Sequence, residues 1–438
     1  MSILEAAEIR SFVTSAAHPL PGGPAEYDPL LRAIGNARLV LLGEESHGTH
    51  EFARARVDVT KRLIREKGFQ GVAVEADAPD AARVDRWVRG APDDADASAA
   101  LSGFRRFPSW PWRNTDVLDF VEWLRAHNDA LLAGHQKAGF YGLDLYSLHA
   151  SMEEALSRLR LVDPDAGRRA EARYACFDRF GGDAQGWGAA ATFGHAIPCE
   201  DDVIGRLVER RSRSAREAGL ASGADERFAR DAAAYYRSLF GSPVLAWGLR
   251  ERHMAETLDA LAERLSGSGE PAKLVVWAHS AHLGDARATE MGDGGERSLG
   301  QLVRGRRGAE AFAVGFTTDS GTVTAASSWD GPARRKRLNP ALPGSYEALF
   351  HEVRYPRFFL DLHGNRETEL VLSEQRLERA VGAVYRPETE RQSHYFLATL
   401  ARQFDAVVHF DLTRALEPLD RSALWMKGDP DGTRPLGI

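Results

Sequence analysis

Acidic and histidine side chains gather in residues 39–52, where a short apolar run stops at a glycine. The run Leu-Val-Leu-Leu and Gly43 are followed within a few positions by Glu44, His47 and His50. Imidazole changes its protonation state near neutral pH, and a nearby carboxylate can hold or orient its proton. The combination is suited to proton transfer or metal binding, and the apolar run before it predicts a buried strand that delivers these groups to a site.

Reactive side chains also follow three other short apolar runs, at residues 71–74, 139–143 and 273–278. They are, in chain order, Glu75, Asp77, Asp144, His279 and His282. The carboxyl ends of parallel strands share one edge of a sheet, which is where open α/β sheets bind ligands. A single strand-end acid such as Glu75 or Asp144 could equally cap a helix or accept loop amides. Four charged strand ends together predict a site.

Serine hydrolysis and metal catalysis are two chemistries to weigh for these residues. The sequence has no Gly-x-Ser-x-Gly element, and Ser46 and Ser280 lack the flanking glycines of a nucleophile turn. The spacings His47-x-x-His50 and His279-x-x-His282, with the nearby acids, offer metal ligands, although neither pair matches His-Glu-x-x-His. Serine is the weakest candidate, and the metal reading stays open.

A third chemistry uses a histidine as general base, held by a carboxylate, to activate water for attack on a carbonyl carbon. His47 and His279 are the candidate histidines. Arg56 follows His47 by nine residues on the same predicted helix, about two and a half turns further, and could orient a carboxylate or stabilise an oxyanion. We expect structural roles for His50 and Glu51.

The apolar pattern predicts the elements that position these groups. Residues 38–75 read as strand, helix and strand, with the helix at 49–67 ended by Gly68. A second helix is expected at 114–135, capped by Asn114 or Thr115. Residues 147–265 are helical in pattern with a break at 241–243. Further strands are predicted at 310–316, 322–326, 381–385 and 404–410.

These elements predict an α/β fold with a central, mainly parallel sheet flanked by helices and a large helical insertion. We expect one catalytic unit over residues 1–438, with its core at about 25–146 and 270–438 and the insertion at about 147–266. Trp247 and the pair Tyr235 and Tyr236 in the insertion could line a large cleft, although each alone reads as ordinary core.

The composition is that of a soluble globular protein, with 438 residues of which 43% are hydrophobic and 27% charged. A net charge of −7 disfavours nucleic acid and acidic membranes as partners and favours a small molecule. The basic run at residues 334–337 is expected to be a solvated loop. Cys176 and Cys199 have no disulfide or metal spacing, and no leader or apolar span is apparent. We predict a cytoplasmic protein.

The motifs together resemble one family. Residues 43–52 look like the signature Gly-Glu-x-x-His-Gly-Thr-x-Glu-Phe of erythromycin esterase family proteins. Further similar stretches lie at residues 74–77, 112–114, 122–123, 140–144, 254–256, 277–282 and 385–395. The resemblance covers most of the chain and implies an erythromycin esterase-like fold.

The resemblance also implies an activity and roles. Members related to the macrolide-resistance enzymes open a lactone ring with histidine-activated water, with no covalent intermediate and no required metal. The resemblance therefore implies that this protein uses no cofactor and no metal. By this likeness His47 would be the general base, Glu75 its carboxylate partner, His279 a second catalytic histidine, and Arg56 and Glu44 further charged groups. Asp77, Asp144 and His282 would support the site.

Two positions differ from the resistance esterases. Glu45 and Ser46 stand where those enzymes have Ala or Ser followed by Thr, so Glu45 is expected to add a negative charge beside the base, which could raise its basicity or repel an anionic substrate. Ser280 stands where many relatives have Asn.

The sequence therefore predicts a hydrolase for a carboxylic ester or lactone, with a macrolide-like macrocycle as one possible substrate. A natural-product tailoring enzyme that performs cyclisation or acyl transfer is the first alternative. A metal- or haem-binding protein, as occurs in the wider fold group, is the second. The sequence makes no prediction of the oligomeric state.

Overall fold

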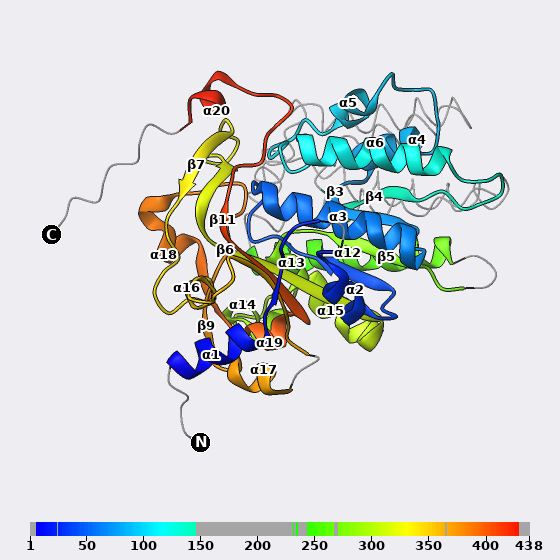
Figure 1. The fold of residues 1–438 in the computed structure, drawn as a ribbon. Helices are drawn as coiled ribbons and strands as arrows, with labels where there is room; N and C mark the ends of the chain where they lie inside the picture. Colours follow the sequence, from blue (N-terminus) through cyan, green and yellow to red (C-terminus); the bar gives the residue numbers. More distant parts are fainter. Residues whose placement is uncertain are drawn as a thin grey trace. The chain divides into compact units, whose positions relative to one another are not determined.

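The computed structural model of the protein describes residues 6–23, 25–145, 231, 234, 243–266, 270–363 and 366–428 (Figure 1). These residues belong to two compact units. The first comprises residues 1–74, 83–141 and 259–438, and the second residues 75–82 and 142–258. Most of the predicted insertion lies outside the described residues, as do Cys176, Cys199, Tyr235 and Tyr236, so the proposed insertion and its boundaries stay a prediction.

A mixed, mostly parallel sheet is the centre of the fold, as predicted. Its strands are ordered β1-β8-β11-β6-β2-β5-β3-β4, and β7 pairs with β6. The pairs β2 with β5, β2 with β6, β3 with β5 and β11 with β6 are parallel. Antiparallel strands lie toward one side, where β8 joins β1 to β11.

The strands have the following bounds: β1 His18–Pro19, β2 Leu39–Leu42, β3 Gly71–Asp77, β4 Gly139–Asp144, β5 Leu274–Trp277, β6 Ala311–Ala325, β7 Arg334–Leu338, β8 Arg357–Asp361, β9 Arg376–Arg379, β10 Tyr395–Ala398 and β11 Ala406–Thr413. Strands β9 and β10 form a separate two-stranded sheet. The four runs whose ends carry the predicted site residues are β2, β3, β4 and β5.

The described helices have the following bounds: α1 Ala6–Ala16, α2 Asp28–Ile34, α3 His50–Lys67, α4 Ala78–Val88, α5 Ala97–Ala100, α6 Thr115–Asp129, α12 Pro243–Leu265, α13 Ser280–Leu283, α14 Glu290–Asp293, α15 Leu299–Arg307, α16 Tyr346–His351, α17 Arg366–Val371, α18 Glu390–Ser393, α19 Leu400–Gln403 and α20 Ala423–Lys427. Within the described residues, no helix combines the length and the apolar character needed to cross a membrane.

Three sequence expectations about the later strands are wrong. The two strands predicted at 310–316 and 322–326 are one long strand, β6. Gly321 lies within it, and its φ of 139° and close approach to the backbone of Thr413 leave no room for a Cβ. Residues 334–337 form β7 instead of a loop, since their burial alternates, with Lys336 and Leu338 facing inward. Residues 381–385 make only isolated bridges.

The helix expected after the first strand is confirmed. Helix α3 runs from His50 to Lys67, and its apolar side is fully buried. Gly68 follows the helix and donates its N–H to Leu63 O. Its φ of 69° lies in the left-handed region, and this conformation is the usual reason for a glycine after the end of a helix. Helices α3 and α6 lie side by side in Figure 1 and pack on each other.

Asn114 caps α6, as predicted. Its Oδ1 accepts the N–H of Val117 at 2.8 Å, and its Nδ2 donates to the carbonyl oxygens of Trp110 and Pro111. We expect Asn114→Ala to lower the free energy of unfolding by about 1–2 kcal/mol, because a cap and two further hydrogen bonds are lost. Urea denaturation would measure this loss. Asp96→Ala, which removes the cap of the short helix α5, is the control and should cost less.

Trp277, the last residue of β5, joins the sheet to the helices that cover it. Its ring lies 4.9 Å from that of Phe120 in α6, and its Nε1 donates to Thr60 Oγ1 in α3 at 3.0 Å. The guanidinium of Arg56 lies over the same ring, 5.4 Å from the centroid. This packing fixes α3, and therefore Arg56, relative to the carboxyl ends of β2 and β5.

Candidate active site

The loop of residues 43–49 connects β2 to α3 and passes very close to neighbouring backbone. A Cβ on Gly43 would lie 2.7 Å from Ser280 Oγ, and one on Gly48 would lie 1.8 Å from Thr324 O. The approach at Gly48 admits only glycine, and a side chain at position 43 would require Ser280 to move. The two glycines of the signature therefore let the loop enter the space between α13 and β6.

Backbone hydrogen bonds hold the loop on both sides. Ser280 N donates to Glu44 O at 2.8 Å, and Val381 N donates to Glu45 O at 2.7 Å. The hydroxyl groups of Ser46 and Thr49 bond to each other. A loop with this many contacts presents its side chains in one fixed arrangement, which suits a catalytic site.

Glu44 and His47 form a hydrogen-bonded pair on this loop. His47 Nδ1 lies 2.9 Å from Glu44 Oε1. A carboxylate only accepts, so Nδ1 carries the proton and the lone pair of the neutral ring is on Nε2. The described residues give Nε2 no hydrogen-bond partner, and the His47 side chain keeps 14% of its surface exposed. This is the arrangement of a base that is oriented by an acid.

Arg56 binds the other oxygen of Glu44. Its Nη2 lies 2.6 Å from Glu44 Oε2, and the arginine side chain is only 2% exposed. Its Nε and Nη1 atoms are buried without hydrogen-bond partners among the described residues. The expectation that Arg56 orients a carboxylate fits this contact, since Glu44 is held between Arg56 and His47.

His279 lies beside His47, with ring centroids 4.9 Å apart. Its Nε2 donates to Glu45 O at 3.1 Å, and its Nδ1 accepts the N–H of Ala281 at 3.2 Å. These contacts define the neutral tautomer with the proton on Nε2. Both ring nitrogens are therefore engaged, and of the two histidines His47 is the one with a lone pair directed away from the backbone.

The histidine pairs considered as metal ligands do not form a metal group among the described residues. His50 Nδ1 donates to Asp116 Oδ2 at 2.7 Å, and its Nε2 accepts from Arg414 at 2.7 Å. The structural role expected for His50 fits these contacts. His282 is buried in α13, and Trp247 is a half-buried residue of α12.

The second unit holds three of the predicted acids. Glu75 and Asp77 are the last residues of β3 rather than residues after it, and Asp144 ends β4. Arg250 of α12 donates to Glu75 at 2.6 Å and makes a two-pronged contact with Asp144 at 3.0 and 2.6 Å. All of these side chains are buried. A buried arginine thus joins two of the strand-end acids that the sequence singled out.

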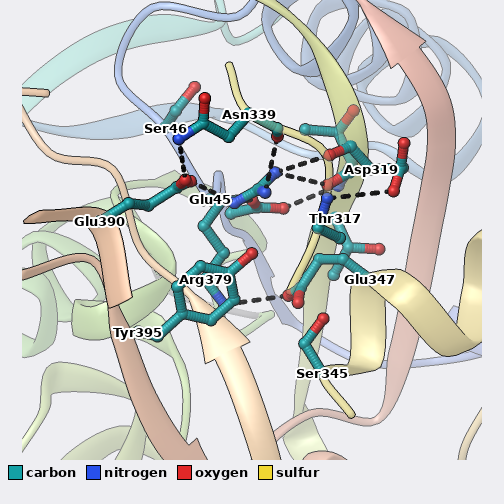
Figure 2. A network of polar contacts seen from close by, with 12 residues as sticks. Glu45, Ser46, Thr317, Asp319, Asn339, Ser345, Glu347, Arg379, Glu390 and Tyr395 are labelled. Carbon is teal, nitrogen blue, oxygen red and sulfur yellow. Dashed lines mark hydrogen bonds and ion pairs between the residues drawn. The ribbon is translucent and has the colours of Figure 1, made fainter. Parts of the chain in front are cut away.

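Glu45 does not act as a free negative charge beside the base. Its carboxylate accepts the N–H of Thr318 at 2.7 Å and lies 3.8 Å from Arg379 Nε. Figure 2 shows it within a buried network around Arg379, which also contains Glu347 and Glu390. Burial, followed by the nearby charge of Glu347, raises the pKa of Glu45 well above its usual value. The expectation that Glu45 adds a negative charge beside His47 is therefore wrong, because its carboxylate contacts Thr318 and Arg379 instead.

Glu378, beside this network, gives a prediction about pH. Burial, and then the charge of Glu347, raises its pKa well above the usual value. Glu378 thus keeps its proton to higher pH in the folded protein than in the unfolded chain. The stability that this difference contributes is fully present below the pKa of Glu378 in the unfolded chain, about 4.3, and is lost as pH rises toward its pKa in the folded protein. We expect Glu378→Gln to remove this loss, which is about 1.4 kcal/mol per pH unit in that range.

Urea denaturation between pH 5 and pH 9 would measure the effect. The variant should gain stability over the original protein as pH rises, and a constant difference would contradict the assignment. Glu374→Gln is the matched control, because Glu374 is 52% exposed and should leave the pH dependence unchanged.

Sequence reasoning missed Arg250 and Arg379. Arg379 is fully buried and donates to the carbonyl oxygens of Thr318, Asp319 and Asn339. Arg250 contacts an acid 106 positions before it. A lone arginine in a helical or alternating pattern usually marks a surface position. The apolar residues near Arg250 and Arg379 were therefore the only feature of the sequence that could have indicated their burial.

The fold and the site define a class: an α/β protein with a paired carboxylate and histidine on the loop after the first parallel strand. The chain belongs to the erythromycin esterase family, whose model, described as "Erythromycin esterase", matches residues 64–413. The matched residues include Glu75, Asp144 and His279, whereas Glu44, His47 and Arg56 precede them. Membership in this family supports hydrolase activity.

Among curated proteins, the chain is similar to erythromycin esterase type II of Escherichia coli, with 28% identity over 120 residues. This match covers 27% of the chain and about a quarter of the relative, 26% of its length.

Three solved structures share the fold. A Bacillus cereus protein has a TM-score of 0.77 at 20% identity, with 95% of this chain and 99% of that chain covered. A succinoglycan biosynthesis protein gives 0.75 at 21%, with 94% and 98% covered. A histidine-to-asparagine mutant of the erythromycin esterase EreC, in its open conformation, gives 0.62 at 16%, with 92% and 96% covered.

Proposed function

We propose that the protein hydrolyses a carboxylic ester or lactone with His47 as general base and water as the nucleophile. The observation that carries this proposal is the hydrogen bond between His47 Nδ1 and Glu44 Oε1 at 2.9 Å. It leaves the lone pair on Nε2, which is the atom that must take a proton from water. Family membership supplies the reaction class, and a macrolide-like lactone is the first substrate to test.

In the proposed reaction, Nε2 of His47 removes a proton from water as its oxygen attacks the acyl carbon. The imidazolium that forms is stabilised by Glu44, whose second oxygen remains paired with Arg56. The proton then passes from Nε2 to the leaving alkoxide, so the ester bond breaks and the base is restored. His279 packs against His47 and is proposed to position its ring.

The acids of the second unit are proposed as further site residues on the basis of the resemblance. Glu75, Asp77 and Asp144 lie in the stretches that resemble the family, and Arg250 holds two of them. Kinetics of Glu75→Gln would test this role. A loss of kcat without a loss of stability supports it, whereas unchanged kcat would assign Glu75 to structure alone.

The activity itself is tested with a panel of macrolides, smaller lactones and linear esters, followed by mass spectrometry. The proposal expects a product heavier than the substrate by one water, or the two fragments of a cleaved ester. One solved structure of the same fold is a succinoglycan biosynthesis protein, which favours a tailoring enzyme as the second candidate. A product lighter by one water, or an acyl transfer to an added alcohol, would support that candidate.

Removal of metal ions distinguishes the proposed mechanism from that of a metal-dependent hydrolase. We expect kcat to be unchanged after dialysis against EDTA, because the proposed base, its acid and the attacking water require no Lewis acid. Steady-state hydrolysis of the best substrate, with metal content determined by elemental analysis, is the measurement. A loss of activity that Zn²⁺ restores would contradict this mechanism.

A further inference from the structure

Two carboxylates and an imidazole converge at a place in the first unit that the proposed reaction does not use. Asp319 belongs to β6, Asp411 to the neighbouring strand β11, and His351 ends α16. The strand register pairs Phe410 with Thr318 and Leu412 with Ser320, so Asp411 lies opposite Asp319. One potential ligand atom from each of the three residues lies within 4.8 Å of the others.

The contacts among the three residues show where an ion would lie. His351 Nδ1 is 2.5 Å from Asp411 Oδ1 and 3.8 Å from Asp319 Oδ2. The other Asp319 oxygen accepts the N–H of Ala341 at 3.2 Å, which fixes the rotamer. Like charges opposite each other on neighbouring strands are unfavourable. The proton that His351 Nδ1 donates to Asp411 offsets part of this repulsion, and a bound cation would replace that proton. The His351 side chain is 53% exposed, so an ion has a route from solvent.

A buried histidine supplies an independent observation. His409 is fully buried, and its ring packs between Phe350 and Phe358. Its Nδ1 bonds to Thr317 Oγ1 at 2.9 Å, while its Nε2 has no hydrogen-bond partner among the described residues and lies 3.8 Å from Asp411 Oδ1. A buried polar atom without a partner is costly. Carboxylates that bind metals are typically oriented by such a neighbouring group.

We propose that Asp319, His351 and Asp411 bind a divalent transition metal ion such as Zn²⁺, with His409 orienting Asp411 from the core. Carboxylate and imidazole ligands suit zinc and similar ions. The proposed metal site is linked to the loop of residues 43–49 through Asp319, because the preceding residue, Thr318, donates its N–H to Glu45. Figure 2 shows Asp319 and Thr317 in the network around Arg379. The ion would stabilise β6, β11 and α16 rather than take part in hydrolysis.

Isothermal titration with ZnCl₂ tests this site in the full chain, after removal of any affinity tag and of bound metal. The expected result is one equivalent bound per chain, with affinity reduced about 10–100-fold or more by His351→Ala. Because His351 is half exposed, this variant is expected to fold, and its circular dichroism spectrum would verify that. Asp411→Asn should reduce affinity similarly.

Two control variants locate the ion. His363→Ala removes another exposed histidine beside an acid, Asp405 at 3.6 Å, and should bind Zn²⁺ as the original protein does. His47→Ala should also bind normally. No binding by the original protein, unchanged binding by folded His351→Ala, or loss of binding in His47→Ala would each overturn the proposal.

Discussion

Replacement of His47 by alanine is expected to lower kcat for ester or lactone hydrolysis by about 10²–10⁴-fold, which is the usual contribution of a general base. Nδ1 of the ring contacts Glu44, and Nε2 has no hydrogen-bond partner among the described residues, so none of these residues is placed to take over the role of the base. KM should change little, because the loss concerns the transition state. Steady-state kinetics on the best substrate from the panel would measure it.

His50→Ala is the matched control for this variant. His50 lies three positions further on the same segment and is held by Asp116 and Arg414, so its loss should affect stability by about 1 kcal/mol and leave most of the activity. Equal losses of kcat in the two variants would indicate a structural effect of the segment rather than a base at His47.

Of the substitutions proposed for the protein, Glu44→Ala is expected to lower the free energy of unfolding most. Arg56 is 2% exposed, and Glu44 is its ion-pair partner at 2.6 Å. Its remaining nitrogens, Nε and Nη1, have no hydrogen-bond partner in the part of the chain that the structure describes. Glu44→Ala would leave a buried guanidinium without compensation, and breaking such a pair typically costs about 3–5 kcal/mol. Urea denaturation would measure the free energy of unfolding.

The double variant Glu44→Gln with Arg56→Met separates the ion pair from other effects. Since both charges are removed, it should be more stable than Arg56→Met or Glu44→Ala alone. Arg54→Met is the surface control on the same helix, because Arg54 is 46% exposed and pairs with Asp58 and Asp119, which are 35% and 51% exposed. It should stay within about 0.5 kcal/mol of the original protein. A similar loss in Arg54→Met would refute the role of burial.

The strands that carry the site were predictable because they are buried on both faces. Such strands appear as continuous apolar runs, and β2, β3, β4 and β5 each matched a run that ended in the expected acids or histidines. Helix α3 and the Asn114 cap followed from spacing and from cap chemistry in the same way. Local patterns therefore sufficed for these elements and for the side chains at their ends.

Pairings depended on loop and long-range geometry, which local patterns do not contain. The resemblance implied Glu75 as the carboxylate partner of His47, and that pairing stays a prediction. The acid that contacts Nδ1 in the loop itself is Glu44, three positions before His47. The conformation of the loop decides this contact. The strand β7 was missed because four successive basic residues concealed an alternation of burial. The turn of Glu45 toward Arg379 likewise required a residue more than 300 positions away.

Chemical rescue of His47→Gly tests the central claim most directly. Glycine removes the imidazole and leaves space, so added imidazole can act as the missing base in solution near Glu44. We predict that the variant hydrolyses the best substrate at a rate near background, and that the rate rises in proportion to imidazole concentration. The original protein should show no such increase. Hydrolysis by His47→Gly at the original rate without imidazole would contradict the assignment of His47 as the base.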